Sequence, residues 1–345
     1  MAVGWGVIGA GGIASRRTIP EGILPARGAR LAAVMDVDAA RAQAASERFG
    51  GVPWFTEIEP LLARGDVEAV YIATPTIAHA PQALAAIAAG KHVLVEKPLA
   101  MTVAQGRRLA AAAKRKGILV GTGFMMRHHG AHVKIRQLIE SGAIGKPVMG
   151  RAQLSCWYPP IAGAWRQDPA LGGGGSFADM GNHCFDLLEM FLGRVAEVHA
   201  FLGNVVHDYQ SEDTALVTFR FASGALGVVD NLFNVPDEAS RNVLEIYGST
   251  GGIRCEGTIG QTPGGTVRLV SVKTGGYDAR QQRAAAKERA IPFRQVNTYR
   301  AEIEDFTRAV RTGGRPAVPL EDGLWNLRVV EAAYRSACTG RVVRL

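Results

Sequence analysis

The sequence predicts an α/β domain with a doubly wound parallel sheet, followed by an α+β domain with a large, mostly antiparallel, open sheet. Up to about residue 123, short apolar runs alternate with alanine-rich segments of helical period. After residue 124, β-branched runs separated by turn residues dominate, as in antiparallel hairpins. We therefore expect domains at residues 1–123 and 124–345, with packing of the terminal helices back on the first domain as an alternative for those helices, and 345 residues suffice for two domains.

The composition excludes several classes of protein. No apolar run reaches the roughly 18 residues of a membrane span, so no membrane partner is expected. Four widely spaced cysteines predict reduced thiols and a cytoplasmic location. The net charge of +8 comes from scattered arginines, and the one dense run, residues 114–116, ends a predicted helix, where the dipole favours cations. We expect no nucleic-acid partner, since no basic stripe is interleaved with aromatic residues.

In the first domain, strands and helices strictly alternate. The run at residues 93–95 is short, apolar and β-branched, as in a buried parallel strand. The expected strands are residues 4–8, 29–35, 67–73, 93–95 and 118–121, and the expected helices are residues 39–49, 77–89 and 103–116.

A glycine motif, Gly9-Ala10-Gly11-Gly12-Ile13-Ala14, directly follows the first strand. Gly9 permits a tight turn, Gly11 lets the backbone approach a pyrophosphate, and the next helix begins there. Asp36 ends the second strand about 20 residues later, where an acid meets ribose hydroxyls and repels a 2′-phosphate. The motif predicts a dinucleotide-binding (Rossmann) domain that prefers NAD to NADP, against the alternative of a plain glycine turn. Arg41 weakens this preference, although a surface role on the next helix is favoured for it.

A lysine ends another strand of this sheet. Residues 93–95 stop at Glu96-Lys97-Pro98, and ligands bind beyond the carboxyl ends of such strands. The proline restricts the backbone of Lys97. A solvated Glu–Lys pair beside a turn proline is the alternative.

The second domain is predicted to be mostly strands. Its sheet is too wide to be covered by so few helices, so we expect a homodimer or homotetramer joined sheet to sheet. The expected strands are residues 148–158, 195–206, 214–221, 225–233, 243–247, 252–255 and 267–272, and the expected helices are residues 131–141, 176–192, 299–312 and 321–339.

An acid and a histidine share one predicted helix behind four glycines, residues 172–175. Asp179, His183 and Asp186, spaced by four and three residues, fall on one helix face. Such a pair suits proton transfer, although a buried histidine satisfied by an aspartate is the alternative. His128, His129 and His132 lack metal-site spacing and a nearby thiolate, so no metal is expected and they are interpreted as solvated or substrate-proximal, with His129 or His132 lining a sugar cleft.

Together these motifs resemble the glucose–fructose oxidoreductase, inositol dehydrogenase and rhizopine-catabolism (Gfo/Idh/MocA) family, over essentially the whole chain. The resemblance rests on the glycine motif, Glu96-Lys97-Pro98, Trp165-Arg166, and residues 173–186, 302–306 and 332–336. It implies that Lys97 and His183 lie beside the nicotinamide and the substrate carbon. Residues 158–166 resemble a sugar-reductase branch that includes anhydrofructose reductases and tends to use NADP. Asp36 departs from that branch, and Thr76 stands where the family often has Asn.

The resemblance implies an NAD(P)-dependent dehydrogenase or reductase acting on a sugar, anhydrosugar or inositol-type polyol, with NAD preferred. His183 takes the hydroxyl proton while Lys97 stabilises the developing alkoxide, so both are expected in one cleft. The alternatives are an NAD-retaining glycosidase and a non-catalytic nucleotide sensor. The candidate catalytic residues are Lys97, His183 and Asp179; the candidate cofactor-binding residues are Ile8, Gly9, Gly11, Gly12, Ile13, Asp36, Thr74, Pro75, His79, Glu96 and Lys97; the candidate substrate-binding residues are Arg127, Trp165, Arg166, Asp179 and His183.

Overall fold

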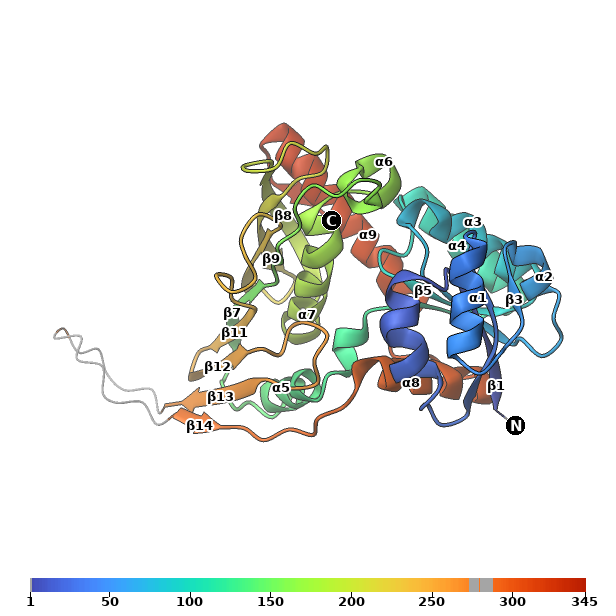
Figure 1. Ribbon diagram of the computed structural model, residues 1–345. Coiled ribbons are helices and arrows are strands. Elements are labelled where there is room, and N and C mark those ends of the chain that lie inside the picture. Colours follow the sequence, from blue (N-terminus) through green and yellow to red (C-terminus); the bar gives the residue numbers. More distant parts are fainter. Residues whose placement is uncertain (1, 273–278, 280–287) are drawn as a thin grey trace. The chain divides into compact units, whose positions relative to one another are not determined.

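The computed structural model describes residues 2–272, 279 and 288–345, and the chain forms two compact units (Figure 1). Two segments of the later chain, Ala164–Gly174 and Asn297–Glu331, join Met1–Met125 in unit 1. Unit 2 consists of Met126–Gly163, Gly175–Val296 and Ala332–Leu345. In the described chain no helix has both the length and the apolar composition that a bilayer span requires.

Unit 1 contains a six-stranded sheet in the order β3-β2-β1-β4-β5-β6, with every pair parallel. The strand order reverses between β1 and β4, and ligands bind beyond the carboxyl ends of strands at such a switch point. This topology confirms the predicted doubly wound sheet. The strands are β1 (Val3–Ile8), β2 (Ala29–Met35), β3 (Trp54–Phe55), β4 (Ala69–Ile72), β5 (His92–Glu96) and β6 (Val120–Gly123).

Helices bury both faces of this sheet. Val93 and Val95 belong to one apolar cluster and Leu94 to another, because successive strand residues point to opposite faces. This explains why the strands appear as continuous apolar runs. The helices of unit 1 are η1 (Ala14–Ile23, π-helical), α1 (Ala39–Arg48), α2 (Ile58–Leu62), α3 (Thr76–Ala88), α4 (Val103–Lys116), η3 (Trp165–Gln167), α6 (Pro169–Gly172), α8 (Thr298–Thr312) and the part of α9 (Leu320–Thr339) up to Glu331.

Unit 2 contains a nine-stranded sheet in the order β14-β13-β12-β11-β7-β10-β9-β8-β15. The β7–β10 pair is parallel and the other pairs are antiparallel, which confirms the predicted mostly antiparallel sheet. The strands are β7 (Pro147–Gln153), β8 (Val195–Gly203), β9 (Thr214–Phe221), β10 (Leu226–Leu232), β11 (Val243–Gly248), β12 (Gly251–Glu256), β13 (Thr266–Ser271), β14 (Glu288–Ala290) and β15 (Val343–Arg344).

The expected strand over residues 148–158 is too long, since β7 ends at Gln153. The backbone N–H of Ser155 bonds the Asn242 side chain instead of a neighbouring strand. Several short elements were not predicted, because two to five residues carry too little periodicity to mark them. They are β3, α2, η2 (Met125–His128), η3, α6, β14 and β15.

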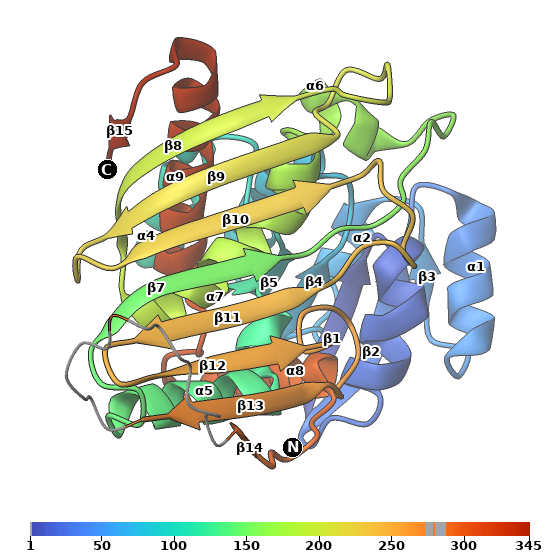
Figure 2. The ribbon, with the colours of Figure 1, turned by 90° about the vertical axis from the view of Figure 1, so that its left-hand side faces the viewer.

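Helices α5 (Gly130–Glu140) and α7 (Asn182–Leu192) lie behind the sheet of unit 2 as Figure 2 shows it. Gly150 in β7 allows α7 to approach, since a Cβ there would lie 2.8 Å from Leu188. In β9, Val217 and Phe219 are buried on this side while Leu216 faces the other way and is exposed. The second face, toward the viewer in Figure 2, carries no helix among the described residues.

Candidate active site

The glycine motif joins β1 to η1 at the switch point of the parallel sheet. Gly9 has a φ of +86°, and a Cβ there would lie 2.9 Å from the Ala73 backbone, so only glycine fits. At Gly12, by contrast, a Cβ would meet no atom within 4 Å. No described side chain caps the N-terminus of η1. The loop therefore has an open side and a positive helix end, which fit the pyrophosphate of a dinucleotide.

Asp36 is held against this loop at the end of β2. Its Oδ2 accepts the N–H of Gly11 at 3.0 Å, and its Oδ1 accepts the N–H of Asp38 at 3.1 Å. Arg41 lies beside the same loop, because its Cδ is 3.3 Å from the position of a Cβ on Gly11. It also pairs with Asp38 at 3.4 Å. An acid and a cation thus both lie where the adenosine ribose binds in this fold.

His79 ties together two strand ends. Its side chain is buried in α3, with Nε2 2.9 Å from the Thr74 carbonyl and Nδ1 2.7 Å from the Pro98 carbonyl. Burial lowers the pKa of His79, although both carbonyls oppose the shift. Both ring nitrogens of His79 thus face carbonyl groups of the protein itself. The His79 side chain therefore supports the predicted cofactor-binding segment by holding the backbone at Thr74 and Pro98.

Glu96 fixes the backbone at Lys97. Its Oε2 accepts the Lys97 N–H at 3.2 Å, and its Oε1 accepts the hydroxyl of Tyr71. Thr18 donates to the Tyr71 oxygen at 2.9 Å, and the Lys97–Pro98 bond is cis. Burial raises the pKa of Glu96, while the Tyr71 hydrogen bond and the Lys97 charge lower it. Sequence reasoning missed Tyr71, although a tyrosine inside an apolar strand signals a hydroxyl that needs a partner.

A second buried carboxyl lies near Glu96. Glu302 on α8 is buried, and neither of its oxygens has a hydrogen-bond partner among the described residues. Burial, and then the charge of Glu96, raise the pKa of Glu302 well above its usual value. The sequence pointed to residues 302–306 only through the family resemblance, without a role for this acid.

Trp165 and Arg166 belong to the same unit as Lys97. The Arg166 guanidinium lies 4.1 Å from the centre of the Trp165 ring. Both residues lie in η3, directly before α6, and α6 packs against α3, which carries His79. Five predicted site residues of unit 1 therefore gather around the carboxyl end of β5, namely His79, Glu96, Lys97, Trp165 and Arg166.

Asp179 and His183 lie in unit 2 on consecutive helical segments, η4 (Phe177–Gly181) and α7. Their spacing of four residues places them on one face, as predicted. The His183 side chain is 7% exposed. Gly181 lets the backbone between these two residues pack against Phe177 and Asn231, because a Cβ there would lie 2.3 Å from the Phe177 ring and 2.6 Å from the Asn231 amide oxygen.

Arg127 forms a buried ion pair with Asp186 of α7. The Arg127 Nε donates to Oδ2 at 2.8 Å, and Nη2 donates to Oδ1 at 2.5 Å. This bidentate geometry is the strong form of an arginine–carboxylate contact. It indicates a structural role for Arg127, which lies in η2 (Met125–His128), and a contact with a sugar stays a prediction.

The interpretation of His129 and His132 as solvated is wrong, since both are fully buried with rings 4.9 Å apart. His129 Nδ1 accepts the Ala131 N–H at 3.1 Å and so caps α5. Burial lowers the pKa of His132 to about 3. Within the described residues no group of three or more His, Cys, Asp or Glu side chains could hold a metal ion.

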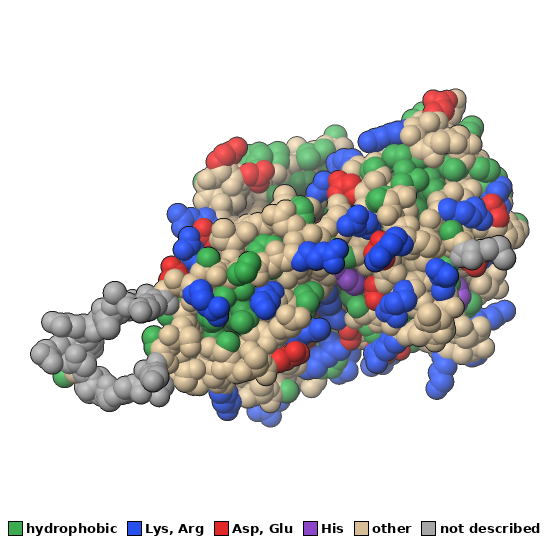
Figure 3. All heavy atoms as spheres, turned by 90° about the horizontal axis from the view of Figure 1, so that it is seen from below, with side chains coloured by type: hydrophobic (Ala, Val, Ile, Leu, Met, Phe, Trp, Pro, Cys, Tyr) green, Lys and Arg blue, Asp and Glu red, His purple; other side chains and the backbone are tan. Residues whose placement is uncertain are grey.

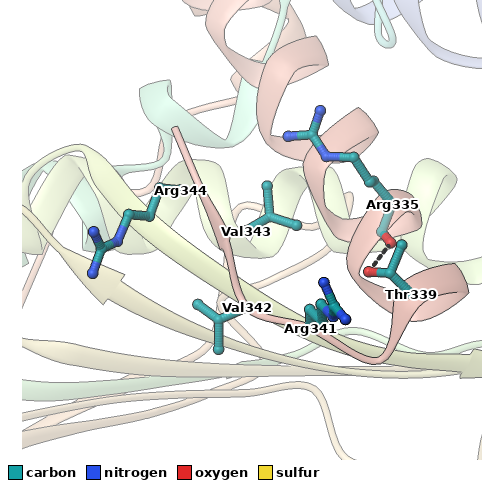
Figure 4. A pocket seen from close by; sticks show the side chains of 6 residues that line it. All are labelled: Arg335, Thr339, Arg341, Val342, Val343 and Arg344. Carbon is teal, nitrogen blue, oxygen red and sulfur yellow. Dashed lines mark hydrogen bonds between the residues drawn. The ribbon is translucent and has the colours of Figure 1, made fainter.

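One hollow of unit 2, of about 630 Å³, contains none of the predicted site residues (Figure 4). Its arginines diverge, and Arg344 bonds to Glu197 at 3.2 Å, so no convergent anion site forms. In the view of Figure 3 the basic side chains are scattered, with acidic ones among them. Neither feature competes with the strand-end cluster. The hollow is lined by Arg335, Thr339, Arg341, Val342, Val343 and Arg344.

Comparison with known proteins gives the same picture. A family model described as "Oxidoreductase family, NAD-binding Rossmann fold" matches residues 3–124, and the model "GFO/IDH/MocA C-terminal domain" matches residues 132–254. A 1,5-anhydro-D-fructose reductase of Ensifer adhaerens is 32% identical over 99% of this chain and 98% of its own. A myo-inositol 2-dehydrogenase of Thermotoga maritima is 31% identical over the same shares of both chains.

A solved structure is also similar over its whole length. The aldose–aldose oxidoreductase of Caulobacter crescentus, complexed with glycerol, has a TM-score of 0.89 and 26% identity, with 100% of both chains covered. Both halves of the sequence match models of one family, and full-length relatives exceed 30% identity. The chain therefore belongs to the Gfo/Idh/MocA family of oxidoreductases, whose first domain is an NAD-binding Rossmann fold.

Proposed function

We propose that the protein transfers a hydride between NAD(P) and a secondary alcohol or ketone of a sugar, anhydrosugar or inositol-type polyol. The observation that carries this proposal is Lys97, held at the carboxyl end of β5 by Glu96 in the unit with the glycine loop. The sugar and polyol names of the full-length relatives support the substrate class. The proposal keeps residues 1–123 as the cofactor domain and residues 124–345 as the substrate-binding and oligomerisation domain, from which Ala164–Gly174 and Asn297–Glu331 belong to the compact unit of the cofactor domain.

The reaction divides its tasks among a few side chains. The bound nicotinamide accepts or supplies the hydride. A neutral His183 takes the hydroxyl proton during oxidation, while the Lys97 ammonium orients that hydroxyl and stabilises the charge that develops on its oxygen. Asp179, on the same helix face as His183, holds a neighbouring sugar hydroxyl. Trp165 and Arg166 supply a stacking surface and a donor to the sugar.

A substrate panel tests the proposal directly. Purified protein is mixed with 1,5-anhydro-D-fructose, myo-inositol, aldoses and simple glycosides, each with the oxidised and reduced forms of NAD and NADP. We expect the absorbance of reduced nicotinamide to change with at least one polyol or ketose. Glycoside cleavage without net cofactor turnover would identify an NAD-retaining glycosidase instead. Cofactor binding with neither reaction would identify a nucleotide sensor.

We expect NAD to bind more tightly than NADP, because the Asp36 carboxylate favours ribose hydroxyls over a 2′-phosphate. Asp36→Ser removes hydrogen bonds to a charged group, worth about 1.5–3 kcal/mol, so NAD affinity falls roughly tenfold or more. Arg41→Ala lowers only the affinity for NADP. Titration of protein fluorescence measures both cofactors. Tighter NADP binding by the wild type would show that Arg41 outweighs the repulsion from Asp36. If Asp36→Ser lowers the affinities for NAD and NADP equally, Asp36 only holds the glycine loop and does not select the cofactor.

A cytoplasmic location is part of the proposal. Cys184 and Cys255 are buried, and burial raises the pKa of each thiol to about 12. Buried thiols of this kind are inert and stay reduced. Because such thiols are inert in any compartment, the proposed location rests on the wide spacing of the four cysteines.

We also propose that the open face of the nine-stranded sheet joins two copies of the chain, as a dimer or within a tetramer. Arg151, Glu245, Arg254 and Arg268 face one another on adjacent strands. This row contains charges of both signs. A twofold axis can therefore place the carboxylate of one copy opposite an arginine of the other copy. Beside it lie apolar side chains exposed on the same face, including Met149, Leu216 and Leu226.

The double variant Met149→Glu/Leu226→Glu should abolish this assembly, because it places carboxylates on apolar side chains that are 39% and 47% exposed in the single chain. Light scattering at micromolar concentration gives the mass. Leu24→Glu, at an apolar residue of unit 1 that is 49% exposed, is the matched control and should leave the mass unchanged. A wild type that is monomeric would contradict the proposal.

A further inference from the structure

A buried glutamate holds the start of the helix that carries Asp179 and His183. Glu212 lies two residues before the start of β9, and its side chain is buried. Its Oε2 accepts the N–H of Gly175 at 2.8 Å, and its Oε1 accepts the N–H of Phe177 at 2.9 Å. The mechanism above gives Glu212 no task.

The backbone of Glu212 completes this contact. Its carbonyl accepts the N–H of Ser176 at 2.9 Å, so three consecutive backbone donors, residues 175–177, end on one residue. The first N–H groups of a helix have no partner inside it and are usually satisfied by a neighbouring cap. Here the cap comes from a different part of the chain. A Cβ on Gly175 would lie 2.0 Å from the backbone carbonyl oxygen of Glu212, which explains why a glycine stands there.

Tyr334 holds the same carboxylate from α9 (Leu320–Thr339). Its hydroxyl donates to Glu212 Oε1 at 2.8 Å, and its ring lies edge-on to Phe177 with centroids 6.4 Å apart. Both contacts lie within unit 2. Tyr334 belongs to residues 332–336, which the family resemblance singled out without a role, and it fixes the rotamer of Glu212.

The neighbouring Asp213 anchors the backbone of Glu212. Its carboxylate accepts the N–H groups of Val205, Val206 and His207 at 2.8–2.9 Å. The two adjacent acids thus bind two different segments. Asp213 binds the loop that precedes both acids, and Glu212 binds the start of the η4–α7 helix. A carboxylate anchored in this way cannot follow a helix that shifts, so it sets the position of that helix.

We propose that Glu212, oriented by Tyr334, is a positioning residue that sets where His183 and Asp179 lie relative to the substrate. The inference rests on the proposed function, because it takes the proton-transfer role of His183 from there. A general base must lie within about 2.6–3.2 Å of the proton that it removes. A displacement of about 1 Å lowers the rate roughly 10²-fold. The glycine loop belongs to unit 1 and this helix to unit 2, so we expect a displaced helix to change cofactor affinity little.

Two conservative variants test the inference. Tyr334→Phe removes one hydroxyl and keeps the ring, and Glu212→Gln replaces one acceptor oxygen by a donor NH₂. We expect faster amide hydrogen exchange at residues 175–183, and a kcat that falls about tenfold or more while KM and cofactor affinity change little. A purely structural role would move thermal stability but would not separate kcat from KM.

Glu189→Gln is the matched control, since Glu189 is a buried glutamate at the other end of α7 that accepts the Val195 N–H at 2.8 Å. It should leave exchange at residues 175–177 unchanged. The positioning role is wrong if the amides of residues 175–183 in Tyr334→Phe exchange at the wild-type rate, or if they exchange faster while kcat is unaltered. If Glu212→Gln does not fold, the result for Tyr334→Phe alone decides the question. A wild type that turns over no substrate of the panel would instead overturn the proposed function, and the positioning role with it.

Discussion

His183→Ala is expected to lower kcat/KM by about 10²–10⁴-fold, because it removes the group that takes the hydroxyl proton. Lys97→Ala should lose at least as much, since the ammonium both orients the hydroxyl and stabilises its developing charge. Cofactor affinity of His183→Ala should stay near that of the wild type, because the glycine loop and Asp36 belong to unit 1 and His183 to unit 2. Steady-state kinetics on the best panel substrate and cofactor titration measure the two quantities.

His199→Ala is the control for this experiment, since His199 lies on β8 opposite Thr218 and outside the η4–α7 helix. It should keep wild-type kcat/KM. Retention of more than about a tenth of the activity in His183→Ala would rule out His183 as the general base. Loss of cofactor binding in that variant would instead point to a role in assembling the fold.

Arg127→Met should destabilise unit 2 by about 3–5 kcal/mol, because breaking a buried pair leaves the charge of Asp186 without its bidentate arginine. The pair is well enclosed, with side-chain exposures of 15% and 2%. The free energy of unfolding from denaturant titration measures the effect. Arg127→Met/Asp186→Leu should recover much of the loss, since it removes both charges.

Arg136→Met provides the comparison, because Arg136 pairs with Glu140 on the surface of α5, where the side chains are 49% and 66% exposed. Exposed pairs of this spacing contribute about 0.3–0.5 kcal/mol. If Arg127→Met and Arg136→Met destabilise the protein equally, the buried pair has no special structural weight. If Arg127→Met stays stable but loses sugar affinity, Arg127 binds substrate, as the other prediction for it states.

The order of elements could be predicted well from the sequence because each signal is local. The helix Val103–Lys116 and the strands Ala29–Met35 and Thr214–Phe221 have the predicted bounds. A period of two or of 3.6 residues appears in any window that contains it, and glycine or proline marks its end. The same reasoning found the glycine loop and Lys97, because both follow directly from a strand that ends at the ligand edge of a parallel sheet.

The spacing of charged residues was less informative. Asp179, His183 and Asp186 share one helical pattern, yet Asp186 forms the ion pair with Arg127, which lies 59 residues earlier. A helical spacing determines which residues share a face and does not determine what that face meets. The interpretation of His129 and His132 as solvated failed for the same reason, since only packing shows that both rings are buried.

By itself the sequence determined the two sheet classes, the dinucleotide loop with Asp36, and the strand-end position of Lys97. Tertiary structure alone revealed the groups that hold these parts, namely Tyr71 beside Glu96, and Tyr334 with Glu212 at the start of the η4–α7 helix. It also assigned Trp165 and Arg166 to the unit of Lys97. The physical reason is range: periodicity and turn chemistry act over a few residues, whereas Tyr334 and Glu212 are 122 residues apart, and their hydrogen bond exists only once the chain has folded.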